Sequence, residues 1–165
     1  MPTTLTTLVA MFTQPGGASN FFDTVVSKKV SLENAYMETS SSIGGIVRVL
    51  NIDYHKSVTV RWTVNDWSTF TEVGATYVPG SSDGFSDKFS FRLGVGSLPI
   101  GSRIQFCLRY NSSGAEFWDS NNGANYVFQV CRYLVCYLGF AIRLPCEILF
   151  KRLKAQSVLL EGGFM

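Results

Sequence analysis

The residues best suited to binding chemistry lie between positions 117 and 126, where the sequence reads FWDSNNGANY. Aromatic rings flank a turn made of Asp, Ser, Gly, Ala and three Asn. Sugars need both kinds of group, because their C–H faces pack on flat rings while their hydroxyls need donors and acceptors of fixed geometry. We interpret the segment as a candidate polysaccharide-binding loop. The alternative is a simple hairpin turn, with Trp118 and Tyr126 buried beneath it as core residues.

Two further groups of residues favour the same chemistry. Trp67 stands in the polar sequence VNDWS at positions 64–68, directly after an expected strand. A Trp in a polar turn is a good candidate for a ring exposed on one face, although it could also fold back as a lid on the end of the domain. Tyr54 and Lys56 form a third, weaker group.

Catalysis has no comparable support in the sequence. The single histidine, His55, follows Tyr54 without a nucleophile or carboxylate motif, so we expect a solvated surface residue. No nucleotide-binding, metalloprotease or hydrolase fingerprint occurs. Scattered acids could form the carboxylate pair of a glycosidase only by chance; they are Asp53, Asp66, Glu72, Asp83, Asp87, Glu116 and Asp119. We therefore predict no catalytic residue, no metal and no cofactor.

The composition predicts one globular domain and argues against nucleic acid as a partner. The chain has 165 residues, 46% of them hydrophobic, and a net charge of +2. Phosphate binding needs a clustered basic face, whereas the only basic concentration here is KRLK at 151–154. The N-terminus lacks a basic segment followed by an apolar run, so we expect no signal peptide and an intracellular protein.

The four cysteines do not predict a metal site or a disulfide framework. Cys107 lies in an expected strand, and Cys131, Cys136 and Cys146 lie in an apolar tail. They show neither CxxC spacing nor accompanying histidines.

Short segments of alternating polarity predict the scaffold that positions these groups. From Val30 onward, apolar residues recur at every second position between turns rich in Gly, Ser, Asn and Asp. The expected core residues are Val47, Val49, Val58, Val60, Trp62, Val64, Phe89, Phe91, Leu93, Ile104, Phe106, Leu108, Tyr110, Tyr126, Phe128 and Val130. The pattern predicts an all-β fold, an immunoglobulin-like antiparallel β-sandwich of seven or eight strands.

This interpretation divides the chain into a lead-in at 1–29, the sandwich at 30–130 and a short apolar C-terminal extension at 131–165. The extension is apolar from Tyr133 to Ile142, but Arg143 and Pro145 then interrupt it. A membrane span needs about 20 apolar residues. We therefore expect a packed or poorly ordered extension, with a membrane anchor or interfacial attachment as the weaker alternatives.

The same segments carry a family resemblance across residues 30–130. In order, they are NIDYHKSVTVR at 51–61, Asp66-Trp67, QFCLRY at 105–110 and FWDSNNGANY at 117–126. Together they resemble carbohydrate-binding module family 21. The lead-in FTQP at 12–15, VSLEN at 30–34 and Phe106-Cys107 are closer to the glycogen-targeting regulatory subunits of protein phosphatase 1 than to the starch-binding domains of glucoamylase.

The resemblance implies a non-catalytic module that binds glycogen or another α-1,4-glucan. It places Trp67, Trp118, Asn121 and Asn125 in a first sugar site, and Tyr54 with Lys56 in a second. It also implies recruitment of the phosphatase catalytic subunit and of glycogen synthase, and a cytoplasmic, glycogen-associated location. The residues at 118–126 that match a synthase-binding segment are Trp118, Asp119, Asn121, Asn125 and Tyr126.

Two features depart from the family pattern. Ser120 stands where the family usually has Asn. The phosphatase-docking motif, Arg or Lys followed by Val, any residue and Phe or Trp, is also missing. Lys29-Val30-Ser31-Leu32 approaches it, but Leu replaces the ring and the segment is expected to be a strand. A glucan-binding module without phosphatase recruitment, or a sandwich serving only protein contacts, remain the alternative hypotheses.

Overall fold

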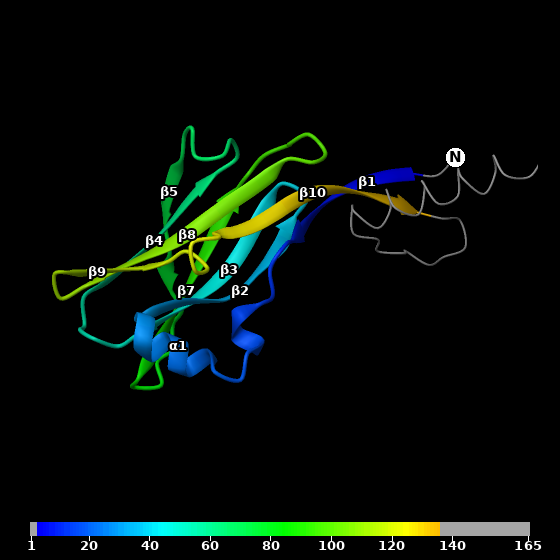
Figure 1. Cartoon of the computed structure of the whole chain (residues 1–165). Helices are drawn as coiled ribbons and strands as arrows, with labels where there is room; N and C mark the ends of the chain where they lie inside the picture. Colours follow the sequence, from blue (N-terminus) through cyan, green and yellow to red (C-terminus); the bar gives the residue numbers. More distant parts are fainter. Residues whose placement is uncertain (1–2, 136–165) are drawn as a thin grey trace, which may run out of the picture.

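The computed structural model describes residues 3–135 as two antiparallel sheets packed face to face, with one short α-helix at one end (Figure 1). The elements are β1 (Thr3–Ala10), the 3-10 turn η1 (Pro15–Gly17), α1 (Phe21–Lys28), β2 (Val30–Thr39), β3 (Ser42–Leu50), β4 (Lys56–Thr63), β5 (Thr71–Gly74), β6 (Thr76–Tyr77), β7 (Ser86–Gly94), β8 (Arg103–Ser112), β9 (Ala115–Asp119) and β10 (Tyr126–Val135). The fold is the predicted antiparallel β-sandwich.

The first sheet has the order β1-β10-β8-β4-β5, with β9 also paired to β8, and the second has the order β2-β3-β7-β6. Alternation along each strand sends one set of side chains between the sheets. On β8, Ile104, Phe106, Leu108 and Tyr110 are buried, whereas Gln105 and Arg109 lie on the outer face and are only half-buried. The core predicted from the period-2 pattern is confirmed for these positions.

Val64 is an exception to the predicted core. Strand β4 ends at Thr63, so Val64 falls in the following turn and is exposed. Trp62 is only partly buried, although it packs against the core cluster. The alternation was therefore extended one residue too far into the loop that carries Trp67.

Gly44 and Gly45 lie inside β3. Their role is to let rings from neighbouring strands approach the backbone. A Cβ on Gly45 would overlap the Phe91 ring, and one on Gly44 would lie 2.9 Å from the Tyr36 ring. The two glycines thus make room for aromatic packing on both faces of the strand.

The described chain has ten strands, more than the seven or eight expected. The additional strands are short or lie outside the expected limits: β5 and β6 have four and two residues, and β1 pairs with β10 from Thr3 opposite Val135 to Ala10 opposite Phe128. The sheet therefore extends beyond both ends of the 30–130 range. The apolar residues of β1 are not spaced by two, so the alternation did not indicate a strand there.

Residues 136–165 lie outside the described residues, and with them Cys136, Cys146 and most of the expected C-terminal extension. Within residues 3–135, no helix has the length and apolar character needed to cross a membrane.

Candidate functional site

The polar loop at 120–125 connects two strands that pair, one after the other, with the same edge of β8. Strands β9 and β10 both pair with the same edge of β8, with Asp119 opposite Leu108 and Tyr126 opposite Phe106. On β8 only Cys107 separates these two partners. Residues 120–125 are therefore extruded from what would otherwise be one continuous strand, which displays the loop beside the outer face of the first sheet.

The asparagines of this loop first serve its own backbone. Asn121, Asn122 and Asn125 have positive φ angles of 51°, 56° and 59°, a conformation that Asn tolerates better than most residues. The Asn125 amide donates to the Ser120 carbonyl at 2.8 Å, and Asn121 Nδ2 donates to the Asn125 carbonyl at 3.0 Å. The Asn121 side-chain oxygen and the whole Asn125 side-chain amide make no hydrogen bond within the described residues. They remain free for a ligand.

A buried carboxylate holds the loop to the rest of the domain. Asp119 Oδ2 accepts hydrogen bonds from the Tyr126 hydroxyl at 2.7 Å and from the Leu32 amide at 2.8 Å, while Oδ1 accepts from the Asn121 amide at 3.1 Å. Burial, reinforced by the Asp119 charge, raises the pKa of Tyr126 above its usual value. One side chain therefore joins β9, β10, the loop and strand β2 of the opposite sheet.

The two side chains of this contact, Asp119 and Tyr126, are both buried. They hold the loop in place and do not face a partner. The alternative interpretation of Tyr126 as a core residue is confirmed, whereas that of Trp118 is wrong. Trp118 is 39% exposed on the outer face of the first sheet, and its Nε1 donates to Glu116 Oε1 at 2.8 Å.

Trp67 is held by hydrogen bonds to residues of β4 and β8. Its Nε1 donates to Gln105 Oε1 at 3.3 Å, and its backbone amide donates to Thr63 Oγ1 at 3.2 Å. The φ angles of Asp66 and Trp67 are 52° and 66°, values that are strained for these residue types and that the Thr63 contact helps to maintain. The half-buried indole is thus fixed at the outer face of β8.

The outer face of β8 brings the candidate residues together. Three residues of β8 point to this face: Gln105, Cys107 and Arg109. Trp67 is bonded to Gln105, and Trp118 lies opposite Arg109 in the sheet. The 120–125 loop leaves the sheet between them, opposite Cys107. At roughly 3.3 Å per residue, the first and last of these strand positions are about 13 Å apart. Burial raises the pKa of the Cys107 thiol, which favours its neutral form beneath this surface.

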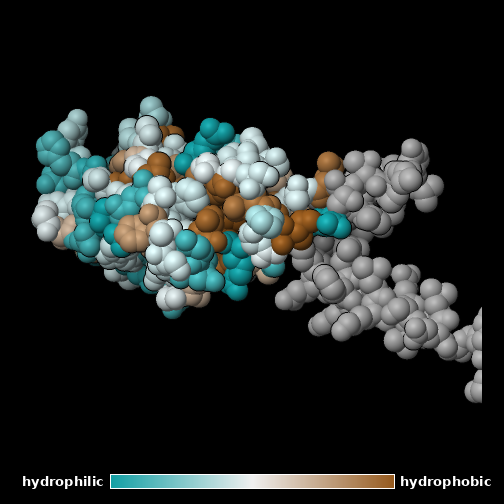
Figure 2. Space-filling model, turned by 90° about the horizontal axis from the view of Figure 1, so that it is seen from above, coloured by the Kyte–Doolittle hydropathy of each residue, from teal (hydrophilic) through white to brown (hydrophobic). Residues whose placement is uncertain are grey.

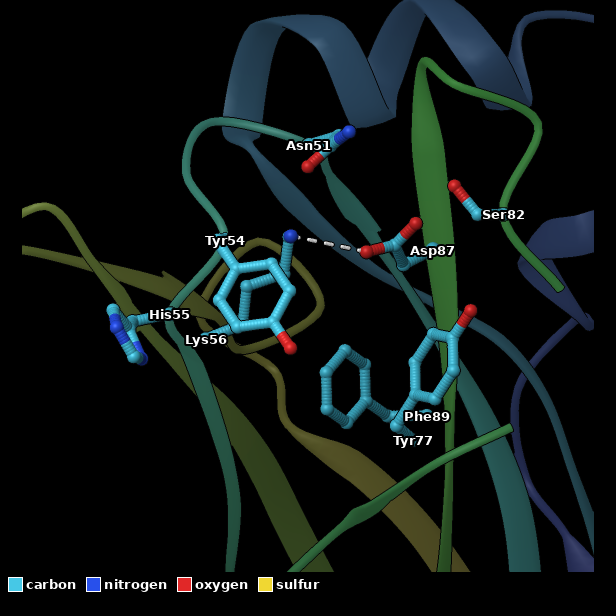
Figure 3. A pocket seen from close by; sticks show the side chains of 8 residues that line it. All are labelled: Asn51, Tyr54, His55, Lys56, Tyr77, Ser82, Asp87 and Phe89. Carbon is cyan, nitrogen blue, oxygen red and sulfur yellow. Dashed lines mark ion pairs between the residues drawn. The ribbon is translucent and has the colours of Figure 1, made fainter. Parts of the chain in front are cut away.

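Tyr54 and Lys56 belong to a separate hollow of about 650 Å³ (Figure 3). Its lining residues are Asn51, Tyr54, His55, Lys56, Tyr77, Ser82, Asp87 and Phe89. Tyr54 is 88% exposed at the rim, and His55 is exposed beside it, as expected from the sequence. Sequence reasoning missed Tyr77 and Asp87 as lining residues and assigned Phe89 only to the core.

A buried ion pair lies at the wall of this hollow. Lys56 Nζ is 3.1 Å from Asp87 Oδ2, and the two side chains are only 7% and 9% exposed. The second carboxylate oxygen, Asp87 Oδ1, is buried and has no hydrogen-bond partner in the described part of the chain. It can accept a hydrogen bond from a ligand hydroxyl, while the surrounding rings supply apolar contact.

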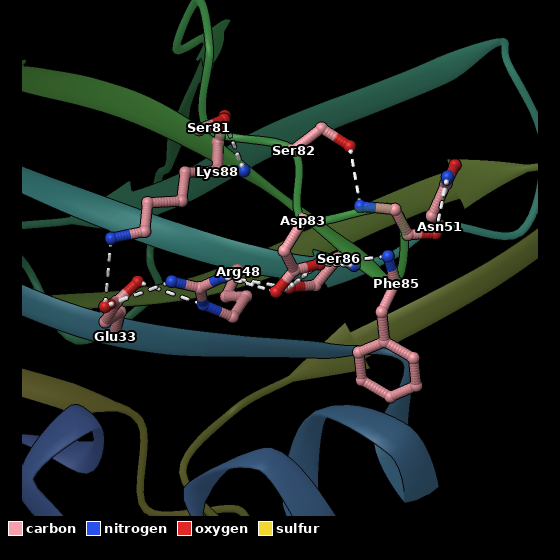
Figure 4. Close-up of polar contacts among 10 residues, drawn as sticks. Glu33, Arg48, Asn51, Ser81, Ser82, Asp83, Phe85, Ser86 and Lys88 are labelled. Atoms are coloured by element: carbon pink, nitrogen blue, oxygen red, sulfur yellow. Dashed lines mark hydrogen bonds and ion pairs between the residues drawn. The ribbon is translucent and has the colours of Figure 1, made fainter.

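A polar network fixes the turn that forms one side of the hollow (Figure 4). The buried Arg48 donates to Ser86 Oγ at 2.8 Å, lies 3.7 Å from Asp83 Oδ2 and pairs with Glu33 Oε2 at 3.3 Å. Asp83 in turn accepts hydrogen bonds from the amides of Ser86 and Phe85, which lower the pKa of its carboxyl group. The network orders the turn that carries Ser82 and leads into Asp87.

Each acid that could have formed a glycosidase pair makes a hydrogen bond or an ion pair with another residue of the domain. They are Asp53, Asp66, Glu72, Asp83, Asp87, Glu116 and Asp119. Within residues 3–135, no group of His, Cys, Asp and Glu is placed to hold a metal ion. The candidate site offers aromatic rings and side-chain amides, which can stack on a ligand and form hydrogen bonds with it.

The segment that resembles a phosphatase-docking motif is not available to a partner. Val30 and Leu32 are fully buried in β2, where they pair with Val49 and Val47 of β3. Docking through their side chains would require this strand to leave the core.

The sequence of this chain is similar to a known protein family and to individual known proteins. The model of the carbohydrate/starch-binding module family 21 matches residues 24–129. Glycogen-binding subunit 76A of Drosophila melanogaster is 47% identical over 124 residues, covering 74% of this chain and 18% of that protein. Protein phosphatase 1 regulatory subunit 3A of Mus musculus is 39% identical over 129 residues, covering 76% of this chain and 12% of that protein.

A solved structure shows the same fold. The solution structure of the carbohydrate binding module of the muscle glycogen-targeting subunit of protein phosphatase-1 is 37% identical, with a TM-score of 0.66. The match covers 80% of this chain and 97% of that module. The match thus covers nearly all of that solved module but less than a fifth of either relative named above.

The anchoring role of Asp119 predicts that loss of the Tyr126 hydroxyl lowers the stability of the domain. Tyr126→Phe leaves one carboxylate hydrogen bond of Asp119 unmade in a buried position, and we expect the free energy of unfolding to fall by about 1–3 kcal/mol. Chemical denaturation measures this change. The matched control, Tyr54→Phe, removes an exposed hydroxyl and should change stability by less than about 0.5 kcal/mol. Equal effects of the two substitutions would contradict the anchoring role.

Proposed function

Because the chain belongs to carbohydrate/starch-binding module family 21, we propose that it binds α-1,4-glucan, glycogen in particular, and catalyses no reaction. The observation that carries this proposal is the register of β8 with its neighbours. It brings Trp67, the amides of the 120–125 loop and Trp118 onto one open face. Two rings separated by hydrogen-bonding amides suit a run of sugar units better than a single small ligand.

In this proposal each residue type has a distinct task. The indoles of Trp67 and Trp118 pack against the C–H faces of glucose rings. The free side-chain atoms of Asn121 and Asn125 bind sugar hydroxyls between them. Ser120 stands where Asn is usual in the family, and its shorter side chain reaches less far, so one such contact with a sugar hydroxyl is weakened or lost.

We propose the hollow around Tyr54 as a second glucan-binding site. The rings of Tyr54 and Tyr77 supply stacking surface, and Lys56 and the unpartnered oxygen of Asp87 supply polar contacts. Since the two sites use different elements, a branched polymer can engage both, which raises its overall affinity above that of either site.

The names of the relatives support a wider role for the full protein. We propose that the full protein brings protein phosphatase 1 to glycogen and glycogen synthase in the cytoplasm, with this module supplying the contact to glycogen, so that glycogen synthesis is promoted. Direct contact with the synthase would fall on Trp118, Asn121 and Asn125, because Asp119 and Tyr126 are buried. The alternative is a glucan-binding module that does not recruit the phosphatase; it is favoured by the burial of Val30 and Leu32.

The glucan site is tested by co-sedimentation with glycogen. Trp67→Ala and Trp118→Ala should each weaken binding several-fold or more, since a stacked ring contributes about 0.5–1.5 kcal/mol beyond its buried area. The matched control is Tyr36→Ala, which removes an exposed ring from the opposite sheet. If both tryptophan variants are folded and bind glycogen as tightly as the wild type, the site is refuted. No binding by the wild type would favour a sandwich that serves only protein contacts.

The second site makes its own prediction. Tyr54→Ala should reduce glycogen binding while leaving the affinity of the Trp67 and Trp118 site for a short α-1,4-oligosaccharide unchanged. Isothermal titration with maltoheptaose, performed in a Trp67→Ala/Trp118→Ala background, isolates the hollow. If Tyr54→Ala has no effect in that background although binding persists, the remaining site is elsewhere and the hollow is not a glucan site.

Phosphatase recruitment is tested separately by a pull-down of the purified catalytic subunit of protein phosphatase 1. We expect residues 1–165 to bind the catalytic subunit weakly or not at all, because the matching segment is buried in β2. Stable binding that survives Lys29→Ala would show that recruitment uses a different surface of the module. If Lys29→Ala abolishes binding, the segment at 29–32 takes part in docking, and our assignment of it to a purely structural role is wrong.

A further inference from the structure

The indole of Trp118 lies on two guanidinium groups. Arg61 of β4 and Arg109 of β8 have their Cζ atoms 5.0 Å and 5.6 Å from the centre of the Trp118 ring system. Arg109 is directly opposite Trp118 in the sheet register, and Arg61 comes from the next strand across. Both distances are within the range of favourable cation–π contact.

A single carboxylate ties the two arginines together. Glu72 of β5 accepts from Arg61 Nε at 2.9 Å and Nη2 at 2.8 Å through Oε1, and from Arg109 Nη2 at 3.4 Å through Oε2. Two cations that share one carboxylate lie side by side, so they support the indole from the same side. These hydrogen bonds, chiefly that from Arg61, lower the pKa of the Glu72 carboxyl group.

The indole is therefore fixed on one face and at one edge. The guanidinium groups cover the face toward the sheet, and Glu116 accepts the Nε1 hydrogen bond at the edge. Trp118 as a whole residue is nevertheless 39% exposed, so these contacts do not cover it completely. A ring that is already held in its binding orientation loses little conformational entropy when a ligand stacks on it.

Arg61 also contacts a second exposed ring. Its Cζ atom is 4.5 Å from the centre of the Phe70 ring, and Phe70, which immediately precedes β5, is 53% exposed. The guanidinium thus serves two aromatic side chains on the same outer face. This shared contact makes Arg61, more than Arg109, the centre of the arrangement.

We propose that Arg61, set in place by Glu72, is a positioning residue for glucan binding: it holds the Trp118 indole in the orientation whose open face receives a glucose ring. Arg109 assists from below, and none of the three charged groups needs to touch the sugar. The inference rests on the proposed glucan site and adds to it the residues that determine the geometry of the stacking surface.

This role can be separated from stability. The Arg61 and Glu72 side chains are 29% and 33% exposed, and ion pairs of such exposure contribute little to folding. Their removal should leave the sandwich folded while releasing the indole. The positioning role thus predicts a loss of affinity without a comparable loss of stability.

The test measures maltoheptaose affinity by titration calorimetry in a double-mutant cycle of Arg61→Met and Trp118→Ala. Arg61→Met should weaken binding about 2- to 5-fold, the equivalent of about 0.5–1 kcal/mol of lost cation–π contact. It should have no further effect once Trp118 is absent. Arg92→Met, which breaks an exposed ion pair with Glu38 on the other sheet, is the matched control and should bind like the wild type.

The outcomes distinguish this inference from the glucan site itself. If Trp118→Ala weakens binding and Arg61→Met does not, the positioning role is overturned and the glucan site stands. If Arg61→Met weakens binding equally with and without Trp118, Arg61 contacts the sugar directly and the positioning role is again wrong. If the wild type binds no maltoheptaose, the proposed function fails before the inference is reached.

A pH profile provides a second readout. The pKa of Glu72 is lowered from 4.5, so its carboxylate and both ion pairs persist above that value and are lost only as the pH falls through the lowered pKa. Wild-type affinity should be constant from pH 7 to pH 5. Glu72→Gln removes the charge at every pH and should weaken binding already at pH 7, whereas an unchanged affinity would contradict the role of Glu72.

Discussion

The buried carboxylate of Asp119 is the contact on which the candidate glucan site depends. Its three hydrogen bonds reach the first residue of β10, the polar loop and strand β2 of the opposite sheet. A buried carboxylate is costly unless its oxygens are fully bonded, so this arrangement tolerates little change in loop position. The loop is consequently held where it interrupts the strand, although it is rich in polar residues, none of which is buried, and its three asparagines have positive φ angles.

This arrangement separates residues that position from residues that bind. Asp119 and Tyr126 act from inside the sandwich, and the arginines with Glu72 act from the sheet surface below the indole. The surfaces left open belong to Trp67, Trp118 and the free amide atoms of the loop. The same division occurs at the second hollow, where Arg48 orders the turn and Lys56 with Asp87 forms the wall. The segment at 117–126 therefore contains candidate ligand-contacting residues together with residues that only hold the loop in place.

The sequence predicts much of the scaffold and the identity of the two tryptophans, because alternation and polar turns are local signals. It does not predict β1 or the two-residue strand β6, whose pairing depends on partners far along the chain. Nor does it predict that Asp119 is buried or that Tyr77 and Asp87 line a hollow with Tyr54, since these relations arise only when the sheets pack. Trp118 and Tyr126 belong to the same sequence segment, and only the strand register reveals that Tyr126 is buried while Trp118 is exposed.

The most direct test of the glucan site follows the three indole N–H resonances of the protein by NMR during titration with maltoheptaose. Trp62, which packs against the core, provides an internal reference within the same spectrum. We expect the resonances of Trp67 and Trp118 to shift together and to saturate at the same ligand concentration, while that of Trp62 stays in place. Binding that leaves both Trp67 and Trp118 unshifted would contradict the assignment of this face as the principal glucan site.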